Sequence, residues 1–153
     1  MKKPMISLKL QHGVMLLEAL ISILIFSIGI LAVIALQANS IKLASDSKYR
    51  SDANLLANQL VGEMWVAHTS PTFVGDFSTG GARYLAWANS NVAATLPVTG
   101  VSAPTVTITQ ATIAAASTVS STVDINIFWT VPGESPGTAS AHRYSTRTQI
   151  TNN

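Results

Sequence analysis

An apolar stretch near the N-terminus constrains the fold of this chain more than any other feature of its sequence. From Val14 to Leu36 the only charged residue is Glu18. A membrane-spanning helix needs about 20 mostly apolar residues, and this stretch would extend roughly 34 Å as a helix. We therefore expect a single membrane-spanning helix here. Because a lone carboxylate is costly in lipid, we also expect Glu18 to be functional.

The basic residues of the chain are divided unevenly by this stretch. Lys2, Lys3 and Lys9 precede it, whereas residues 14–153 hold six Lys or Arg against seven Asp or Glu, a net charge of −1. This asymmetry predicts a cytoplasmic N-terminus, with the bulk of the chain across the membrane. Because the body of the chain lacks an excess of basic residues, nucleic acid is not an expected partner.

The residues that open the stretch form a recognisable pattern: a basic leader, then Gly13, four apolar residues, Glu18 and the apolar run. This pattern resembles the class III signal of the type IV pilin superfamily. The resemblance implies a leader at residues 1–13, which a prepilin peptidase removes between Gly13 and Val14 before it methylates the Val14 amine. It also implies that Glu18 neutralises the N-terminal amine of a neighbouring subunit during filament assembly.

Two other interpretations of the N-terminus remain, a conventional cleaved secretory signal and a plain uncleaved anchor. Secretory signals have apolar cores of about 7–15 residues, and the run here is longer. Only a weak small-residue cleavage site, Leu36-Gln37-Ala38, follows it.

The pattern after the apolar stretch predicts that the helix continues. No proline occurs from Gln37 to His68, and an apolar stripe recurs at helical spacing, widened by Leu55, Ala57 and Val61. The stripe comprises Tyr49, Ala53, Leu56, Leu60, Met64 and Ala67. We expect one helix from Val14 to about Ala67, with a membrane and filament-core half at 14–38 and an amphipathic half at 39–68. The alternative is a separate second helix after a break near Asn39 and Ser40.

The remaining residues, 69–153, are expected to form a small α+β head. Residues 69–81 are rich in Gly, Ser, Thr and Pro and predict a loop, as do residues 132–137. The Ala-, Ser- and Thr-rich residues 111–121 predict a turn with frayed strand ends. Residues 82–96 predict a helix that buries Leu85, Ala88, Val92 and Leu96, with Trp87 against the long helix. Alternation predicts strands at 105–110, 123–131 and 142–150, arranged as an antiparallel meander packed on the long helix.

Two segments narrow the resemblance within the superfamily. The pattern from Arg50 to Met64, and the piece from Trp87 to Pro97, resemble minor pilins of the PilV type. This resemblance implies a pilin-like fold and a subunit that helps to prime type IV pilus assembly, in support of twitching motility or adhesion. The implied partners are prepilin peptidase, other minor and major pilins, the inner-membrane assembly platform and membrane lipid. The implied location is the inner membrane, single-pass with a periplasmic head, and then the pilus filament or its tip.

Catalysis is not expected from this chain. His12, His68 and His142 are far apart in the sequence, there is no cysteine, and no catalytic, phosphate-binding or metal-binding motif occurs. No cofactor or metal is therefore expected. Asp124 could meet His142 across a hairpin, most simply as a surface pair.

Two further groups of residues have both a functional and a structural interpretation. Arg143, Ser145 and Arg147 could bind an anion or DNA, but a solvated sheet face is the favoured interpretation. The three tryptophans, Trp65, Trp87 and Trp129, are expected to anchor the core.

Two other classes of function share the N-terminal features. One is a minor pseudopilin of a type II secretion system, which has the same anchor and the same peptidase. The other is a membrane-anchored binding module, such as a pilin for DNA uptake or adhesion.

Overall fold

The computed structural model of the chain describes residues 12–113, 118–134 and 142–152. The chain divides into two compact units, residues 1–41 and 42–153, each of which is described by itself. Most of the expected leader, residues 1–11, lies outside the described part. So do residues 114–117 and 135–141, which belong to or adjoin segments that the sequence predicts as turns or loops.

A single helix, α1, runs from His12 to Ala67 over 56 residues. The prediction of one uninterrupted helix is confirmed, and the alternative break near Asn39 and Ser40 does not occur. The Ser40 hydroxyl donates back to the carbonyl oxygen of Leu36 at 3.0 Å, so this polar side chain is satisfied within the helix.

In the N-terminal unit, α1 presents apolar side chains to its surroundings on every face. All residues from Val14 to Ile41 are exposed. The helix is long and apolar enough to cross a membrane. A soluble helix normally confines its apolar residues to one stripe, so this segment has the composition expected of a helix surrounded by lipid or by other helices.

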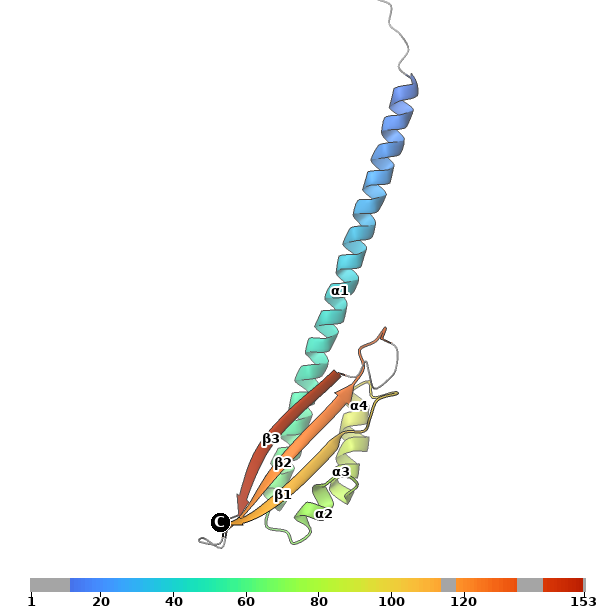
Figure 1. Cartoon of the computed structure of the whole chain (residues 1–153). Helices are drawn as coiled ribbons and strands as arrows, with labels where there is room; N and C mark the ends of the chain where they lie inside the picture. The colour runs from blue at the N-terminus through green and yellow to red at the C-terminus, as the bar shows by residue number, and fades with distance from the viewer. Residues whose placement is uncertain (1–11, 114–117, 135–141, 153) are drawn as a thin grey trace, which may run out of the picture. The chain divides into compact units, whose positions relative to one another are not determined.

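The C-terminal unit is built on a three-stranded antiparallel sheet in the order β1-β2-β3 (Figure 1). The strands are β1 (Thr105–Ile113), β2 (Thr118–Trp129) and β3 (His142–Asn152). Helices cover one face of the sheet, which gives the expected α+β layout with an antiparallel meander. The strands reach further than predicted, because described residues within 111–121 pair in register as strand, Ala111 opposite Ser120 for example.

The core of this unit lies between the second half of α1 and the inward face of the sheet. Five residues of the predicted stripe on α1 are buried in it: Ala53, Leu56, Ala57, Leu60 and Met64. Alternate residues of β2 and the turn after it meet them: Val123, Ile125, Ile127, Trp129 and Val131. The prediction that Leu55 belongs to the stripe is wrong, because its side chain is 73% exposed.

The helix that the sequence predicts at 82–96 is present as an unbroken helical run over residues 82–95, which contains three segments. They are α3 (Ala82–Trp87), the π-helical turn η1 (Ala88–Val92) and α4 (Ala93–Thr95). The indole of Trp87 donates to the carbonyl oxygen of Leu56 at 3.1 Å, so the predicted contact with the long helix is confirmed. Leu85 is 46% exposed, contrary to prediction, because Tyr84 and Trp87 occupy the buried side of α3.

Two further predictions are corrected in this unit. The segment 69–81 contains a short helix, α2 (Phe73–Phe77), whose two phenylalanines are buried one turn apart. Trp65 is 45% exposed and is no core anchor, because it lies on the face of α1 that turns away from the buried stripe. Its ring contacts the ring of His68 edge to face, with centroids 5.9 Å apart.

Truncation of two leucines on α1 tests this assignment of the helix faces. Leu60→Ala should lower the free energy of unfolding by about 2–5 kcal/mol, because Leu60 is fully buried and truncation leaves a cavity. Leu55→Ala, the matched control, should change it by less than about 0.5 kcal/mol. Denaturant unfolding of the full chain in detergent, followed by tryptophan fluorescence, measures both. Equal effects would contradict the assignment.

Candidate functional site

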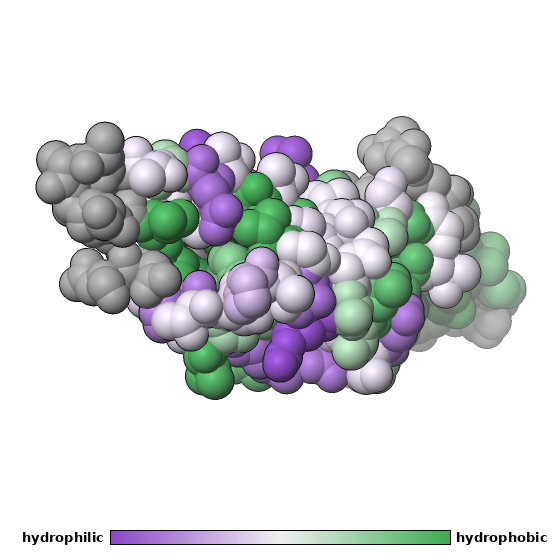
Figure 2. Space-filling view, turned by 90° about the horizontal axis from the view of Figure 1, so that it is seen from below, coloured by the Kyte–Doolittle hydropathy of each residue, from purple (hydrophilic) through white to green (hydrophobic). Residues whose placement is uncertain are grey.

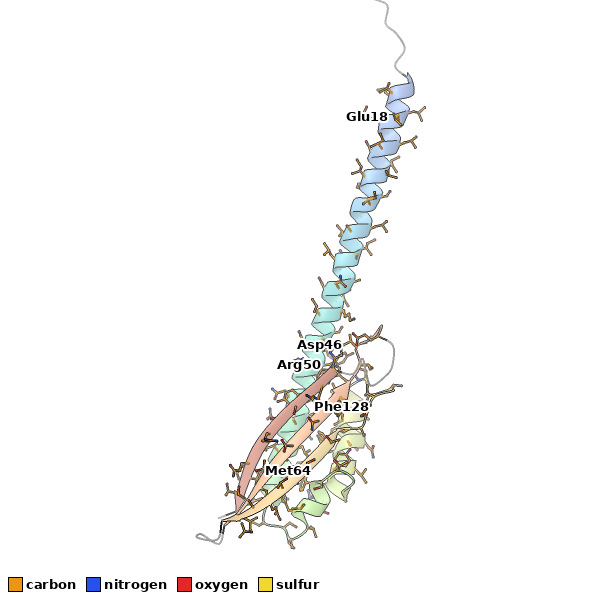
Figure 3. The ribbon with its side chains drawn as sticks, in the orientation of Figure 1. Glu18, Asp46, Arg50, Met64 and Phe128 are labelled. Carbon is orange, nitrogen blue, oxygen red and sulfur yellow. The ribbon has the colours of Figure 1, made fainter. Side chains whose placement is uncertain are left out.

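Glu18 lies on an exposed face of α1 in the N-terminal unit (Figure 3). The Glu18 carboxylate has no hydrogen-bond or ion-pair partner among the described residues. Ser27, in the same apolar stretch, differs, because its hydroxyl donates to the Ile23 carbonyl oxygen at 2.7 Å. The Glu18 carboxylate is thus the one charge between Val14 and Leu36, and no described residue neutralises it.

The predicted cleavage site lies in the first turn of α1. Gly13 follows the first helical residue, and the Val14 side chain is 64% exposed. Val14 and Glu18 are four residues apart, so they occupy the same side of the helix one turn from each other. The structure thus brings together Gly13, Val14 and Glu18 on adjacent turns, and the leader residues 1–11 lie outside the described part.

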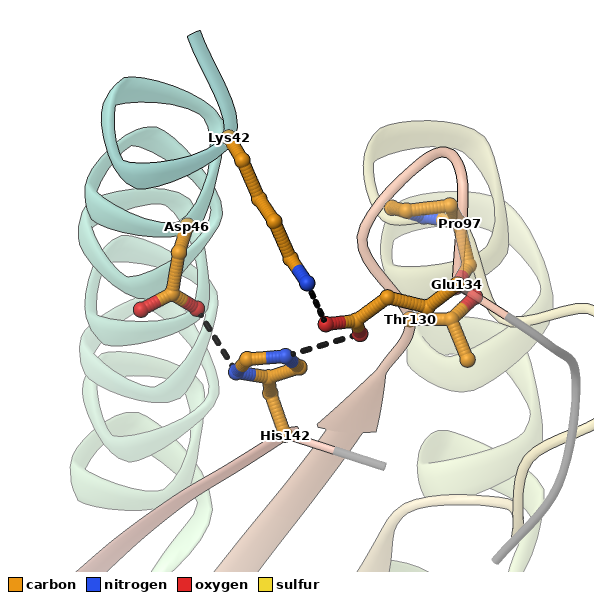
Figure 4. Close-up of polar contacts among 6 residues, drawn as sticks. All are labelled: Lys42, Asp46, Pro97, Thr130, Glu134 and His142. Carbon is orange, nitrogen blue, oxygen red and sulfur yellow. Dashed lines mark hydrogen bonds and ion pairs between the residues drawn. The ribbon is translucent and has the colours of Figure 1, made fainter. Parts of the chain in front are cut away.

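A second polar site lies where α1 enters the C-terminal unit, and we call it the His142 cluster. It consists of Lys42 and Asp46 on α1, Glu134 after β2 and His142 at the start of β3 (Figure 4). His142 Nδ1 lies 2.9 Å from Asp46 Oδ1, and His142 Nε2 lies 3.0 Å from Glu134 Oε2. The other oxygen of Glu134 accepts from Lys42 Nζ at 2.8 Å. One imidazole therefore stands between two carboxylates.

The surroundings of the His142 cluster shield it partly from water. The Glu134 side chain is 17% exposed, and those of Asp46 and His142 are 27% and 28% exposed. The Trp129 ring stacks on the imidazole with centroids 5.9 Å apart and planes inclined by 22°. The hydrogen bond from Lys42, and the weaker one from His142, lower the pKa of Glu134 below its usual value. The Glu134 carboxylate is accordingly held in its charged form.

Local structure fixes the position of each group in the cluster. Lys42 and Asp46 are four residues apart and share one side of α1. Gly133 adopts a positive φ of 91°, and the Glu134 amide donates to the Val131 carbonyl oxygen at 3.1 Å, so a tight turn carries Glu134 back toward the helix. This turn lies within the predicted loop at 132–137.

The sequence suggested a different partner for His142. The register of the sheet places Asp124 opposite Arg147, and Arg147 Nε donates to Asp124 Oδ1 at 2.6 Å. His142 pairs with Trp129 at the other end of the strand, so the suggested contact between Asp124 and His142 is wrong. Asp46 could not be found from the sequence, because it lies 96 residues before His142 and has no pattern that links it to β3.

The arginines of β3 lie on the exposed face of the sheet, as predicted. The hydrogen bond to the Asp124 carboxylate raises the pKa of the Arg147 guanidinium, and the negative charge of Asp124 offsets the positive charge of Arg147. Exposed apolar residues of this unit are scattered rather than gathered, and the view from below shows small hydrophobic patches separated by polar ones (Figure 2). These surfaces give no independent sign of an anion-binding or nucleic-acid-binding face.

No arrangement suited to a metal ion occurs among the described residues.

Comparisons of the chain with known protein families, with curated proteins and with solved structures gave no match. What the chain does is therefore inferred from its own residues and their geometry.

The lowered pKa of Glu134 predicts how the stability of the fold depends on pH. A carboxylate with a pKa below the ordinary value of 4.5 stabilises the fold above that pH, and the contribution is lost as the pH falls through the lower, folded-state value. The melting temperature of the wild type should therefore exceed that of Glu134→Gln at pH 7, with the difference shrinking below about pH 4.5. Glu63→Gln is the control, since Glu63 has no ion-pair partner within the described residues. A constant difference from pH 7 to pH 3 would contradict the assignment.

Proposed function

We propose that this chain is a minor pilin of the type IV pilus class, anchored by α1 in the inner membrane and later incorporated into a filament. The observation that carries the proposal is the pairing of two features on one helix. The apolar segment is exposed on every face, and its single charge, Glu18, has no partner within the described chain.

Both features are explained by a helix that first lies in lipid and then packs among neighbouring helices. In lipid, a carboxylate about one turn from the helix start can reach the interface. In a bundle of helices, an isolated carboxylate would be strongly disfavoured unless a cation met it. Cleavage after Gly13 would create such a cation at the amine of Val14, and a stagger between subunits would bring it to Glu18 of a neighbour.

The C-terminal unit supports the same proposal through its construction. The second half of α1 is part of its core, so one continuous helix carries both the apolar segment and a wall of the folded unit. The first half of α1 could therefore hold the subunit in a helical bundle, while its second half forms part of the C-terminal unit. We infer that its role is structural, in the priming of pilus assembly.

Cleavage at the assigned site is open to a direct test. Gly13→Val should prevent processing, because the peptidase would meet a branched side chain at the residue before the cut. Expression in a cell that contains a prepilin peptidase, followed by N-terminal sequencing and mass spectrometry, measures the result. Wild type should yield methylated Val14 as its first residue. Normal processing of Gly13→Val would refute the assigned site.

The role of Glu18 is tested separately from processing. Glu18→Ala, and the isosteric Glu18→Gln, should be cleaved and inserted in the membrane normally but should be lost from sheared filaments. Leaving a buried amine without its carboxylate typically costs about 3–5 kcal/mol, roughly a hundredfold or more in an assembly equilibrium. Ser27→Ala is the control, because the Ser27 hydroxyl is satisfied within its own helix. Wild-type amounts of either Glu18 variant in filaments would overturn the proposed role.

A further inference from the structure

The His142 cluster has a proton requirement that follows from its geometry. A neutral imidazole carries one N–H group and one lone pair, whereas the imidazolium carries two N–H groups. Both ring nitrogens here lie within 3.0 Å of a carboxylate oxygen, on Asp46 and on Glu134. Only the charged ring presents an N–H group on both sides, as a hydrogen bond to Glu134 and as a charge contact to Asp46, because in the neutral ring one lone pair would face a carboxylate.

Loss of the second proton from His142 would leave a shielded oxygen of Asp46 without a counter-charge. Asp46 Oδ1 is shielded from solvent and has no aligned hydrogen bond within the described chain, so His142 Nδ1 at 2.9 Å is its only counter-charge there. A buried carboxylate oxygen that faces a lone pair is strongly destabilised. No other carboxylate lies within ion-pair distance of the ring among the described residues, and Lys42 is engaged with Glu134. The remaining arginines of these segments, Arg50 on α1 and Arg143 on β3, are both exposed.

The position of the His142 cluster along α1 determines which part of the helix would lose its contact with the sheet if the ion pairs of the cluster broke. From Lys42 to Asp52 no residue of α1 is buried, and the first buried one is Ala53. Beyond Ala53, apolar residues of α1 are fixed in the core between helix and sheet. Between Lys42 and Lys48, about two turns, the contacts of α1 with the rest of the unit are the ion pairs of Lys42 and Asp46, and Tyr49 is the first residue of α1 that packs against the core.

We propose that the His142 cluster is a pH-dependent latch that fastens residues 42–48 of α1 to the sheet when His142 is charged and releases them when it is neutral. Histidine is the side chain whose charge ordinarily changes between pH 5 and 8. The latch closes as the ring takes up its second proton and opens as the ring loses it. Glu134 stays ionised on the acidic side because Lys42 lowers its pKa. The inference does not depend on the proposed role in pili.

Distance measurements between spin labels test the latch in the full chain in detergent. The chain has no cysteine, so labels attach only at introduced positions. Leu43→Cys on α1 and Ser145→Cys on β3 report on the latched turns, since both side chains are exposed. Gln59→Cys with Ser145→Cys is the matched control, because Gln59 is exposed on the part of α1 that the core holds.

The expected result is a narrow distance distribution for the 43–145 pair at pH 5.5 and a loss of that population at pH 8. The 59–145 pair should be the same at both pH values. An unchanged 43–145 distribution, or an equal change in the control pair, would overturn the proposal.

Two substitutions separate the latch from a general effect of pH. Asp46→Asn should keep the 43–145 distribution narrow at pH 8, because the amide can donate to the lone pair of the neutral ring. His142→Gln should abolish the pH dependence, whereas His68→Gln should retain it, since His68 contacts a backbone carbonyl and no carboxylate. A broad distribution for Asp46→Asn at pH 8, or a wild-type pH response in His142→Gln, would contradict the mechanism.

Discussion

The C-terminal unit depends on one packing contact, between the apolar stripe of α1 and the inward face of β2. Neither element could bury its apolar side alone, because a single helix and a three-stranded sheet each have one face that needs cover. Each fully buried aliphatic side chain contributes about 1.5–3 kcal/mol, so Leu60, Ile125 and Ile127 outweigh any polar contact on the surface of the unit. Trp87 adds a hydrogen bond to the same contact and ties the short helices to α1.

The first part of α1 has the opposite character. It is more apolar than the second half, yet no part of it from Val14 to Ile41 is buried. Exposed apolar surface on this scale is typical of helices that contact lipid or other protein. The same helix thus has exposed apolar residues in its first part and buried, core-forming ones in its second half. Glu18 lies in the exposed part, which is why the proposed filament role rests on it.

The residues of α1 in the His142 cluster, Lys42 and Asp46, precede Tyr49, the first residue of the helix that packs against the core. Partly shielded charges contribute less to stability than apolar burial does, but they respond to protons, and apolar side chains do not. A polar attachment at this position can therefore change without unfolding the core that starts at Ala53. Because one imidazole faces two carboxylates, a single proton on the ring changes the balance of charge in the cluster.

Much of this architecture is determined by local patterns in the sequence. The apolar run, the absence of proline after it and the stripe from Tyr49 to Ala67 predict one long helix, and period-two alternation predicts three strands, because these periodicities follow from backbone geometry alone. The motif of Gly13, Val14 and Glu18 is also visible without a structure, since its residues are neighbours in the chain.

Other features were decided only by the tertiary structure. Trp65 and Leu55 are exposed and Phe73 and Phe77 are buried, because the choice among apolar side chains depends on where the sheet and the short helices lie. The His142 cluster joins groups up to 100 residues apart, and its geometry follows from the register of β3 against β2 and from the turn at Gly133. Local periodicity fixes which face a residue occupies, but the partner it meets there is set by how the elements pack.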